Sequence, residues 1–196
     1  MGAPVRLDYK IITDIIESGS KVLDLGCGGG ELIQYIEQRK HARVQGIELD
    51  ENEIYKCVEK GLSVFHGDID DGLKGYPDKT FDYVVLNQSL QEMVELDYVF
   101  EEALRVGKKA IIGFPNFAHM SARIKLFFEG RAPVTKNLPY AWHNTPNLRF
   151  LSIKDFEDFC RKQKIRVINS FYLGYKRKVV FLPNLFAINA IFVVAR

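Results

Sequence analysis

Cysteine is scarce in this sequence, and its spacing suits neither a metal site nor a disulfide framework. The 196 residues include three cysteines, Cys27, Cys57 and Cys160, with no CxxC or Cys/His ligand spacing. A structural zinc site needs ligands at close spacing, and a disulfide framework needs an even set. We therefore expect free thiols, no metal, and a cytoplasmic protein whose core is stabilised by packing alone.

The sequence also lacks long apolar runs and a strong excess of either charge. A membrane-spanning helix needs roughly 20 apolar residues, and the chain has no such run; charges at Arg6, Asp8 and Lys10 argue against a signal peptide. The formal net charge is only +2, too small to indicate nucleic-acid binding on its own. The 47% hydrophobic and 27% charged residues are ordinary for a soluble globular protein. We expect a single domain over residues 1–196, with no membrane and no nucleic acid among its partners.

Short apolar runs alternate with amphipathic stretches along most of the chain. Helical spacing of apolar residues predicts helices over 8–17, 31–39, 51–60, 97–106 and 152–162. Short apolar or β-rich runs predict strands over 21–25, 44–47, 62–65, 81–86, 110–114, 166–173 and 186–194. This alternation is typical of a parallel sheet covered by helices on both faces, and the last two strands, with no helix between them, must pair antiparallel. We predict an α/β fold with a seven-stranded, mostly parallel sheet that ends in a C-terminal antiparallel hairpin.

Two helices carry more detailed expectations. In the helix over 51–60, Ile54, Cys57 and Val58 are expected to face inward. The helix after Ser152 is expected to begin with a capping box, in which Asp155 is the partner of Ser152.

Residues 116–151 interrupt the alternation, and we predict an insertion or lid there because long excursions in compact domains are usually functional. The segment carries a local charge of 5 − 1 = +4, which leaves about 2 − 4 = −2 for the rest of the chain. Six aromatic residues lie among these charges. The pattern fits a lid whose aromatic side chains pack on the sheet, or a surface for a protein or an anionic metabolite. The basic residues are Arg123, Lys125, Arg131, Lys136 and Arg149, against Glu129.

A glycine-rich turn over 24–30 follows the first predicted strand and opens a helix. Glycine allows a tight turn and a close approach of the backbone to a ligand. The dinucleotide fingerprint would need glycine at position 31, where the chain has Glu31, and a phosphate-binding P-loop would need a lysine after the glycines. The carboxylate of Asp24 instead suits an ammonium or sulfonium ligand. The alternative is a plain strand-to-helix connection.

Carboxylates also end the next two strands. Glu48 lies 24 residues beyond Asp24, where an α/β nucleoside site places the acid that binds ribose hydroxyls. Asp68 could accept from an adenine amino group, whereas Asp50 and Asp70 are expected to be solvated or to cap helices. The expected cofactor-binding residues are Asp24, Gly26, Cys27 through its backbone, Gly28, Glu48, Leu49, Asp68, Ile69 and Asn87.

These motifs together resemble a class I S-adenosylmethionine-dependent methyltransferase. The stretches VLDLGCGGGEL, GIELD, FDYVVLNQSLQ, RVGKKAIIGFPNF and LPYAWHNTPN are similar, in order, to the MetW family of methionine biosynthesis proteins. The resemblance covers nearly the whole chain. It implies a Rossmann-like methyltransferase fold, S-adenosylmethionine or S-adenosylhomocysteine as the cofactor, and a role beside homoserine O-acyltransferase. It supplies neither a methyl acceptor nor a catalytic residue.

Two functions stay open on this basis. One is a methyltransferase that acts on a small molecule, in this or another pathway, by in-line displacement at the methyl carbon. The other is an accessory or sensing subunit that binds the cofactor and modulates a partner enzyme. Gln88 and Gln91 could line an acceptor site or face solvent. The insertion offers further candidates for substrate or partner contacts, namely His119, Tyr140, Trp142 and His143.

Overall fold

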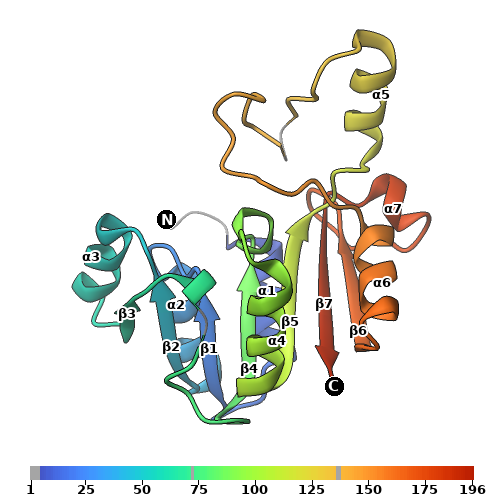
Figure 1. Cartoon of the computed structure of the whole chain (residues 1–196). Helices are drawn as coiled ribbons and strands as arrows, with labels where there is room; N and C mark the ends of the chain where they lie inside the picture. Colours follow the sequence, from blue (N-terminus) through green and yellow to red (C-terminus); the bar gives the residue numbers. More distant parts are fainter. Residues whose placement is uncertain (1–4, 72, 136–137) are drawn as a thin grey trace.

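A single twisted sheet forms the centre of the protein in the computed structural model, which describes residues 5–71, 73–135 and 138–196 (Figure 1). Its strand order is β3-β2-β1-β4-β5-β7-β6. All neighbours pair in parallel except β7, which runs antiparallel to both β5 and β6. The strands are β1 (Lys21–Leu25), β2 (Arg43–Glu48), β3 (Val64–His66), β4 (Phe81–Asn87), β5 (Gly107–Pro115), β6 (Arg166–Leu173) and β7 (Asn189–Ala195). The predicted seven-stranded sheet with one reversed strand and a terminal antiparallel pair is confirmed.

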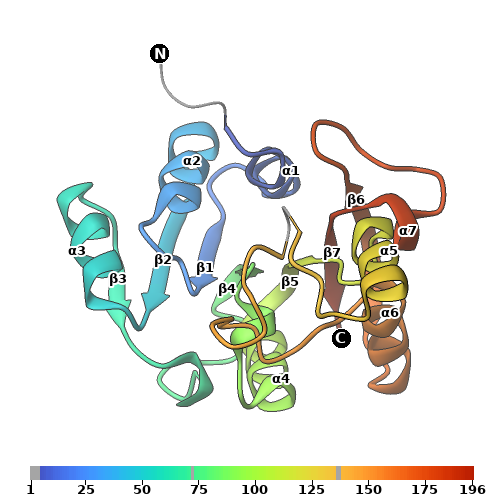
Figure 2. The same cartoon turned by 90° about the horizontal axis from the view of Figure 1, so that it is seen from above.

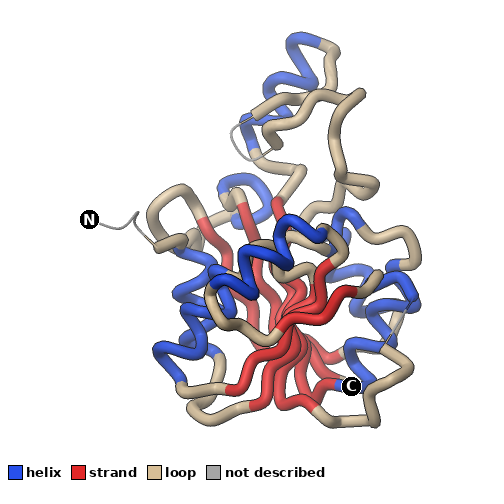
Figure 3. The backbone as a smooth tube through the Cα atoms, turned by 90° about the vertical axis from the view of Figure 1, so that its left-hand side faces the viewer, coloured by secondary structure: helices blue, strands red, loops and turns tan. Residues whose placement is uncertain are grey.

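Helices cover both faces of this sheet, as Figures 2 and 3 show. One core cluster joins the sheet to α1, α2 and α3 through residues such as Ile12, Ile33 and Cys57. The other joins it to α4 and α6 through residues such as Phe100 and Phe156. The helices are α1 (Leu7–Ile15), α2 (Glu31–Lys40), α3 (Glu51–Glu59), α4 (Leu96–Val106), α5 (Met120–Glu129), α6 (Ile153–Lys162) and α7 (Pro183–Phe186), with short 3-10 turns η1 (Ile69–Asp71) and η2 (Leu90–Glu92).

The strand order fixes where a ligand can bind. From β1 the chain first builds outward through β2 to β3, and then returns to place β4 on the other side of β1. The carboxyl ends of β1 and β4 therefore diverge into a crevice, the usual ligand site of open α/β sheets. Both strands are mostly buried because helices cover both of their faces.

The capping box of α6 is confirmed: the Ser152 hydroxyl accepts from the Asp155 N–H, and the Asp155 carboxylate accepts from the Ser152 N–H. The expectation for Val58 was wrong. Cys57 is fully buried and Ile54 half-buried, but Val58 is 61% exposed. The helix α3 lies at the edge of the sheet over the short strand β3, so only a narrow stripe of its surface is covered.

Two helices, α5 and α7, were not predicted from the sequence. The helix α5 lies inside residues 116–151, and only Ala122 of its residues is buried, so its sequence has no apolar stripe facing a core. The helix α7 has one turn and precedes β7, which therefore begins at Asn189 rather than at Phe186. A single turn is too short to show helical periodicity.

Residues 116–151, which we call the insertion, rise beyond the carboxyl ends of the strands (Figure 1). The part of the insertion that returns to α6 crosses above the end of β4 (Figure 2). The prediction that the aromatic side chains of the insertion pack on the sheet does not hold for most of them, since Phe127, Phe128, Tyr140, Trp142 and Phe150 are exposed. The boundaries of the insertion and its role as a lid stay predictions.

Candidate functional site

A cleft of about 500 Å³ opens at the carboxyl ends of β1, β2, β3 and β4. It lies at the divergence of β1 and β4 that the strand order creates. The residues that line it are Gly26, Gly28, Glu48, Leu49, Asp68, Ile69, Asp70, Gln88, Ser89, Glu92, Met93 and Val94. The cleft thus brings together most of the predicted cofactor-binding residues.

The turn after β1 needs glycine at both positions that reach the cleft. Gly26 has φ +72°, and a Cβ there would lie 2.9 Å from the Cβ of Ser89. Gly28 has φ +53°, and a Cβ there would project into open space. Both conformations are in the left-handed region that disfavours other residues. Gly28 therefore leaves room for a ligand to approach the backbone.

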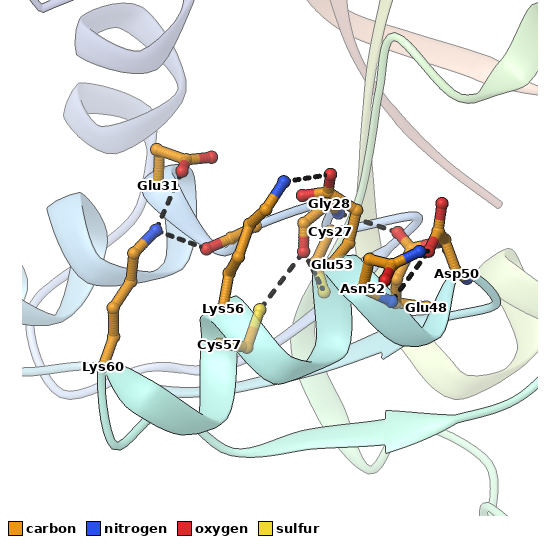
Figure 4. Close-up of polar contacts among 11 residues, drawn as sticks. Cys27, Gly28, Glu31, Glu48, Asp50, Asn52, Glu53, Lys56, Cys57 and Lys60 are labelled. Atoms are coloured by element: carbon orange, nitrogen blue, oxygen red, sulfur yellow. Dashed lines mark hydrogen bonds and ion pairs between the residues drawn. The ribbon is translucent and has the colours of Figure 1, made fainter.

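The carboxylate of Glu48 ties the end of β2 to this turn (Figure 4). One oxygen accepts from the N–H of Gly28 at 2.8 Å, and the other accepts from the N–H groups of Leu49 and Asp50 at 2.8 and 3.0 Å. A carboxylate has about four acceptor positions. Glu48 therefore keeps capacity for a hydroxyl donor while its side chain is held in place.

Asp68 and Asp70 form the wall of the cleft beyond β3. Asp68 accepts from the N–H of Asp70 at 2.9 Å through one oxygen. The carboxylate of Asp70 accepts from the N–H groups of Val94 and Glu95. Asp70 was expected to be solvated or to cap a helix; its carboxylate instead binds amides just before α4, and the residue also lines the cleft. Asp50 does cap α3, through the N–H of Asn52.

Asp24 lies behind the cleft and is only 2% exposed. Burial, followed by the charge of Glu48, raises the pKa of Asp24 from its ordinary 3.8 to about 7. No hydrogen bond to its carboxylate is present among the described residues. Burial without a partner favours the protonated form of a carboxylic acid, and a cationic ligand nearby would favour the charged carboxylate again.

The cleft is acidic and has no basic side chain among the described residues that line it. Glu92 also belongs to it, and desolvation and the charge of Glu48 raise the pKa of Glu92. The nearby Lys60 lies behind the glycine turn, where its ammonium donates to the Gly29 carbonyl and to Glu31 (Figure 4). The site therefore favours a ligand with positive charge and hydrogen-bond donors over a phosphate.

Three predicted residues lie at the margin of the cleft. The thiol of Cys27 is turned toward Gly46, and Cys27 does not line the cleft, so a contact between its backbone and the cofactor stays a prediction. The Nδ2 of Asn87 donates to Asp8 on α1, while its Oδ1 is buried without a partner among the described residues. Of the two glutamines, Gln88 lines the cleft, whereas Gln91 is 5% exposed and its Nε2 donates to the Gln88 carbonyl. Of the two alternatives for Gln91, exposure to solvent therefore does not hold.

The insertion candidates do not line the cleft. His119 caps α5, where its Nδ1 accepts from the N–H of Ser121, and burial lowers the pKa of His119. Tyr140, Trp142 and His143 are exposed, and the rings of Trp142 and His143 meet edge to face. They remain candidates for contact with a partner.

Ser89, at the end of the fourth predicted strand, lines the cleft, and three further residues of the cleft wall were missed: Glu92, Met93 and Val94. They follow β4, and the Ser89 hydroxyl donates to the Leu25 carbonyl at the end of β1. Their position directly after a strand end was the available signal, since ligands bind at the carboxyl ends of parallel strands.

Comparison with solved structures identifies the class of fold. A methyltransferase from Thermotoga maritima, described as S-adenosylmethionine-dependent and a possible histamine N-methyltransferase, superposes with a TM-score of 0.69 at 16% identity, covering 96% of this chain and 88% of that chain. The 4+2 cyclase SpnF superposes with a TM-score of 0.68 at 16% identity, covering 96% and 80%. The chain therefore has the fold of class I S-adenosylmethionine-dependent methyltransferases.

Sequence comparison gives the family. The model of the family described as "Methionine biosynthesis protein MetW" matches residues 6–194, so the chain belongs to the MetW family. The "Bifunctional methionine biosynthesis protein MetXA/MetW" of Rhodopirellula baltica is 38% identical over 163 residues, which cover 79% of this chain and 26% of that protein. The chain spans between 21% and 36% of the length of the curated relatives it matches. Within the described residues, no helix combines the length and apolarity that crossing a membrane requires.

The raised pKa of Asp24 predicts an unusual dependence of stability on pH. An Asp whose pKa is higher in the folded than in the unfolded state stabilises the fold below pH 4, and this contribution is lost as the pH rises through about 7. Asp24→Asn removes the charge, so at pH 8 we expect its free energy of unfolding to exceed the wild-type value by a few kcal/mol, at most on the order of 4. The difference should shrink as the pH falls toward 4. Urea unfolding of both proteins across this range measures it.

A control separates this effect from a general loss of charge. Asp14→Asn neutralises an exposed carboxylate of α1 and should show no such gain at pH 8. If Asp24→Asn is no more stable than wild type at pH 8, the carboxylate of Asp24 is not destabilised by its burial.

Proposed function

We propose that the chain binds S-adenosylmethionine or S-adenosylhomocysteine in the cleft and acts in methionine biosynthesis beside homoserine O-acyltransferase. The observation that carries the cofactor assignment is the cleft itself, which has carboxylates at the ends of successive strands and no basic side chain among its described residues. S-adenosylmethionine has an ammonium and a sulfonium group, ribose hydroxyls and an adenine amino group. Each is a cation or a hydrogen-bond donor, which suits this lining.

The residues present fit the parts of this cofactor. Glu48 keeps acceptor capacity for ribose hydroxyls, and the second oxygen of Asp68 is available to an adenine amino group. The buried Asp24 is suited to a cation. Open space at Gly28 permits close approach of the ligand to the backbone. The fold supports the same assignment, since the T. maritima neighbour is described as S-adenosylmethionine-dependent.

The role in methionine biosynthesis rests on family membership. In R. baltica a MetW-type segment is named together with MetXA in one bifunctional protein. Two activities joined in one chain work side by side. The fusion therefore supports the proposal that homoserine O-acyltransferase, which the family resemblance implies, is a neighbour or partner of this chain. The methyl acceptor, if there is one, has no such support.

The first test is ligand binding. Wild type should melt at a higher temperature with S-adenosylhomocysteine, because a ligand at 100 times its dissociation constant stabilises the fold by about 2.7 kcal/mol. Glu48→Gln keeps the shape of the side chain but loses the charge that attracts hydroxyl donors, so it should lose most of this shift. Differential scanning fluorimetry and calorimetric titration give both quantities. An equal shift in wild type and Glu48→Gln would remove Glu48 from the ribose site, and no shift in wild type would contradict the proposed cleft.

The second test uses two glycines in the same backbone state. Gly28 and Gly61 both have φ in the left-handed region, and a Cβ at either would meet nothing within 4 Å. Gly28→Val and Gly61→Val should therefore cost similar backbone strain, about 1–2 kcal/mol. Only Gly28→Val fills the cleft, so it alone should abolish binding of S-adenosylhomocysteine in calorimetry. Intact affinity in Gly28→Val would mean that the turn is only a connection.

The third test concerns the partner. Phe127 and Trp142 of the insertion are 82% and 79% exposed, and large exposed aromatic residues mark protein interaction sites. Arg131 is exposed and has no hydrogen bond or ion pair among the described residues, unlike Arg149. We expect Arg131→Glu to slow association with the purified acyltransferase and to flatten its salt dependence, and Trp142→Ala to hasten dissociation by about tenfold or more.

Surface plasmon resonance separates the two rates. Arg166→Glu is a matched control, because Arg166 is exposed at the amino-terminal end of β6, at the opposite end of the sheet from the insertion. Rates that are unaltered in Arg131→Glu and Trp142→Ala would show that the insertion is not the surface that binds the acyltransferase.

A further inference from the structure

Residues 91–95 form a segment that supplies one wall of the cleft through Glu92, Met93 and Val94, and we call this segment the wall. Asp70 anchors the wall from the cofactor side. The carboxylate of Asp70 accepts from the N–H of Val94 at 3.0 Å and from that of Glu95 at 2.8 Å. The N–H of Asp70 in turn donates to Asp68 at 2.9 Å. A ligand that binds Asp68 or Asp70 therefore contacts the side chains whose hydrogen bonds hold this wall in place.

The same wall is held from the other side by the insertion. The N–H groups of Leu148 and Arg149 donate to the carbonyl of Gln91 at 2.9 and 3.1 Å. The guanidinium of Arg149 donates to the carbonyls of Met93 at 3.3 Å and Val94 at 2.6 Å. Hydrogen bonds from a charged donor are stronger than neutral ones. The insertion thus binds three residues of the wall, although it lies more than 50 positions away in the sequence.

These bonds matter because the wall has little regular structure of its own. After the short turn η2, which ends at Glu92, residues 93–95 are in neither a helix nor a strand. Backbone groups outside helices and strands need partners from elsewhere. In the wall, the N–H groups of Val94 and Glu95 donate to Asp70. The carbonyls of Met93 and Val94 accept from Arg149. The wall is therefore shared between the cleft and the insertion.

We propose that Arg149 is a positioning residue for the cofactor site, and that binding in the cleft is coupled to the docking of residues 147–151 on the wall. The proposal rests on the proposed function, because it takes S-adenosylhomocysteine as the ligand. A ligand that favours the ordered wall also favours the docked insertion, and the docked insertion favours the ligand by the same factor. Arg149 acts through Met93 and Val94.

The affinity of Arg149 variants for S-adenosylhomocysteine tests the proposal. Arg149→Ala should weaken binding about fivefold or more, the range of typical coupling between sites. Arg149→Lys should restore part of this loss, since an ammonium can donate to one of the two carbonyls. Arg166→Ala removes an exposed arginine at the opposite end of the sheet and should leave the affinity unchanged. Calorimetric titration measures all four proteins, and Arg149→Lys keeps the test decisive if Arg149→Ala fails to fold.

Hydrogen exchange of amides in the insertion provides a second measurement. If Arg149 only stabilised the fold, binding of the ligand would not change this exchange. In wild type, S-adenosylhomocysteine should slow exchange of the Leu148 amide, which donates to Gln91 on the wall. In Arg149→Ala this ligand-dependent protection should be lost, and in Arg149→Lys it should be kept in part. Wild-type affinity in Arg149→Ala and Arg149→Lys, or an unchanged Leu148 amide in ligand-bound wild type, would overturn the coupling and leave the cofactor site intact. No binding to wild type would instead overturn the proposed function, and this inference with it.

Discussion

The cleft depends on holding several carboxylates together without a neutralising side chain. Lysine and arginine are absent from its described lining, and backbone N–H groups take their place. Glu48 accepts from three of them and Asp70 from two. An N–H dipole orients and stabilises a carboxylate but does not cancel its charge. The acidic field therefore remains available to a cationic ligand, and Asp24, which has no such donor among the described residues, has its pKa raised to about 7.

This arrangement makes the site a network of neighbouring strand ends. The turn after β1 is tied to β2 through Gly28 and Glu48, and to the segment after β4 through the Ser89 hydroxyl and the Leu25 carbonyl. The strand ends converge because β4 returns to the far side of β1. The glycines allow the turn to come close enough for these bonds, since a Cβ at Gly26 would collide with Ser89. The geometry of the cleft therefore depends on backbone contacts that reach well beyond the residues that touch the ligand.

Local sequence patterns were sufficient where the signal lies within a few consecutive positions. The strands β1 and β6 have the predicted bounds, and the capping box at Ser152 is present, because apolar runs and cap residues act over a few positions. The patterns failed where a helix has little contact with a core. Periodicity suggested an inward Val58 on an edge helix, and α5 shows none because it is mostly exposed.

For the candidate site, the sequence predicts positions at strand ends but not the bonds made there. Asp24, Glu48 and Asp68 could be located because each follows or ends a strand. The burial of Gln91, the double role of Asp70 and the attachment of Arg149 to Met93 and Val94 depend on contacts between distant segments. No local pattern encodes these contacts, so the sequence could suggest a surface role for Arg149 but not its bonds to the cleft wall.

The fold does not decide whether this cleft supports turnover or only binding, since one structural neighbour is described as a cyclase and another as a methyltransferase. The contacts of the wall bear on this choice. A sensing subunit changes its interaction with a partner when a ligand binds. For this, the ligand must bind one state of the partner-binding segment more tightly than the other. Asp70 and Arg149 hold the same wall from the cleft and from the insertion, so hydrogen bonds connect the cleft to the segment that we propose as the partner surface. A methyltransferase needs in addition a site for an acceptor, and Gln88, one of the two glutamines predicted for such a site, lines the cleft. The proposed coupling through the wall is therefore what an accessory subunit requires, and it is equally compatible with turnover in the same cleft.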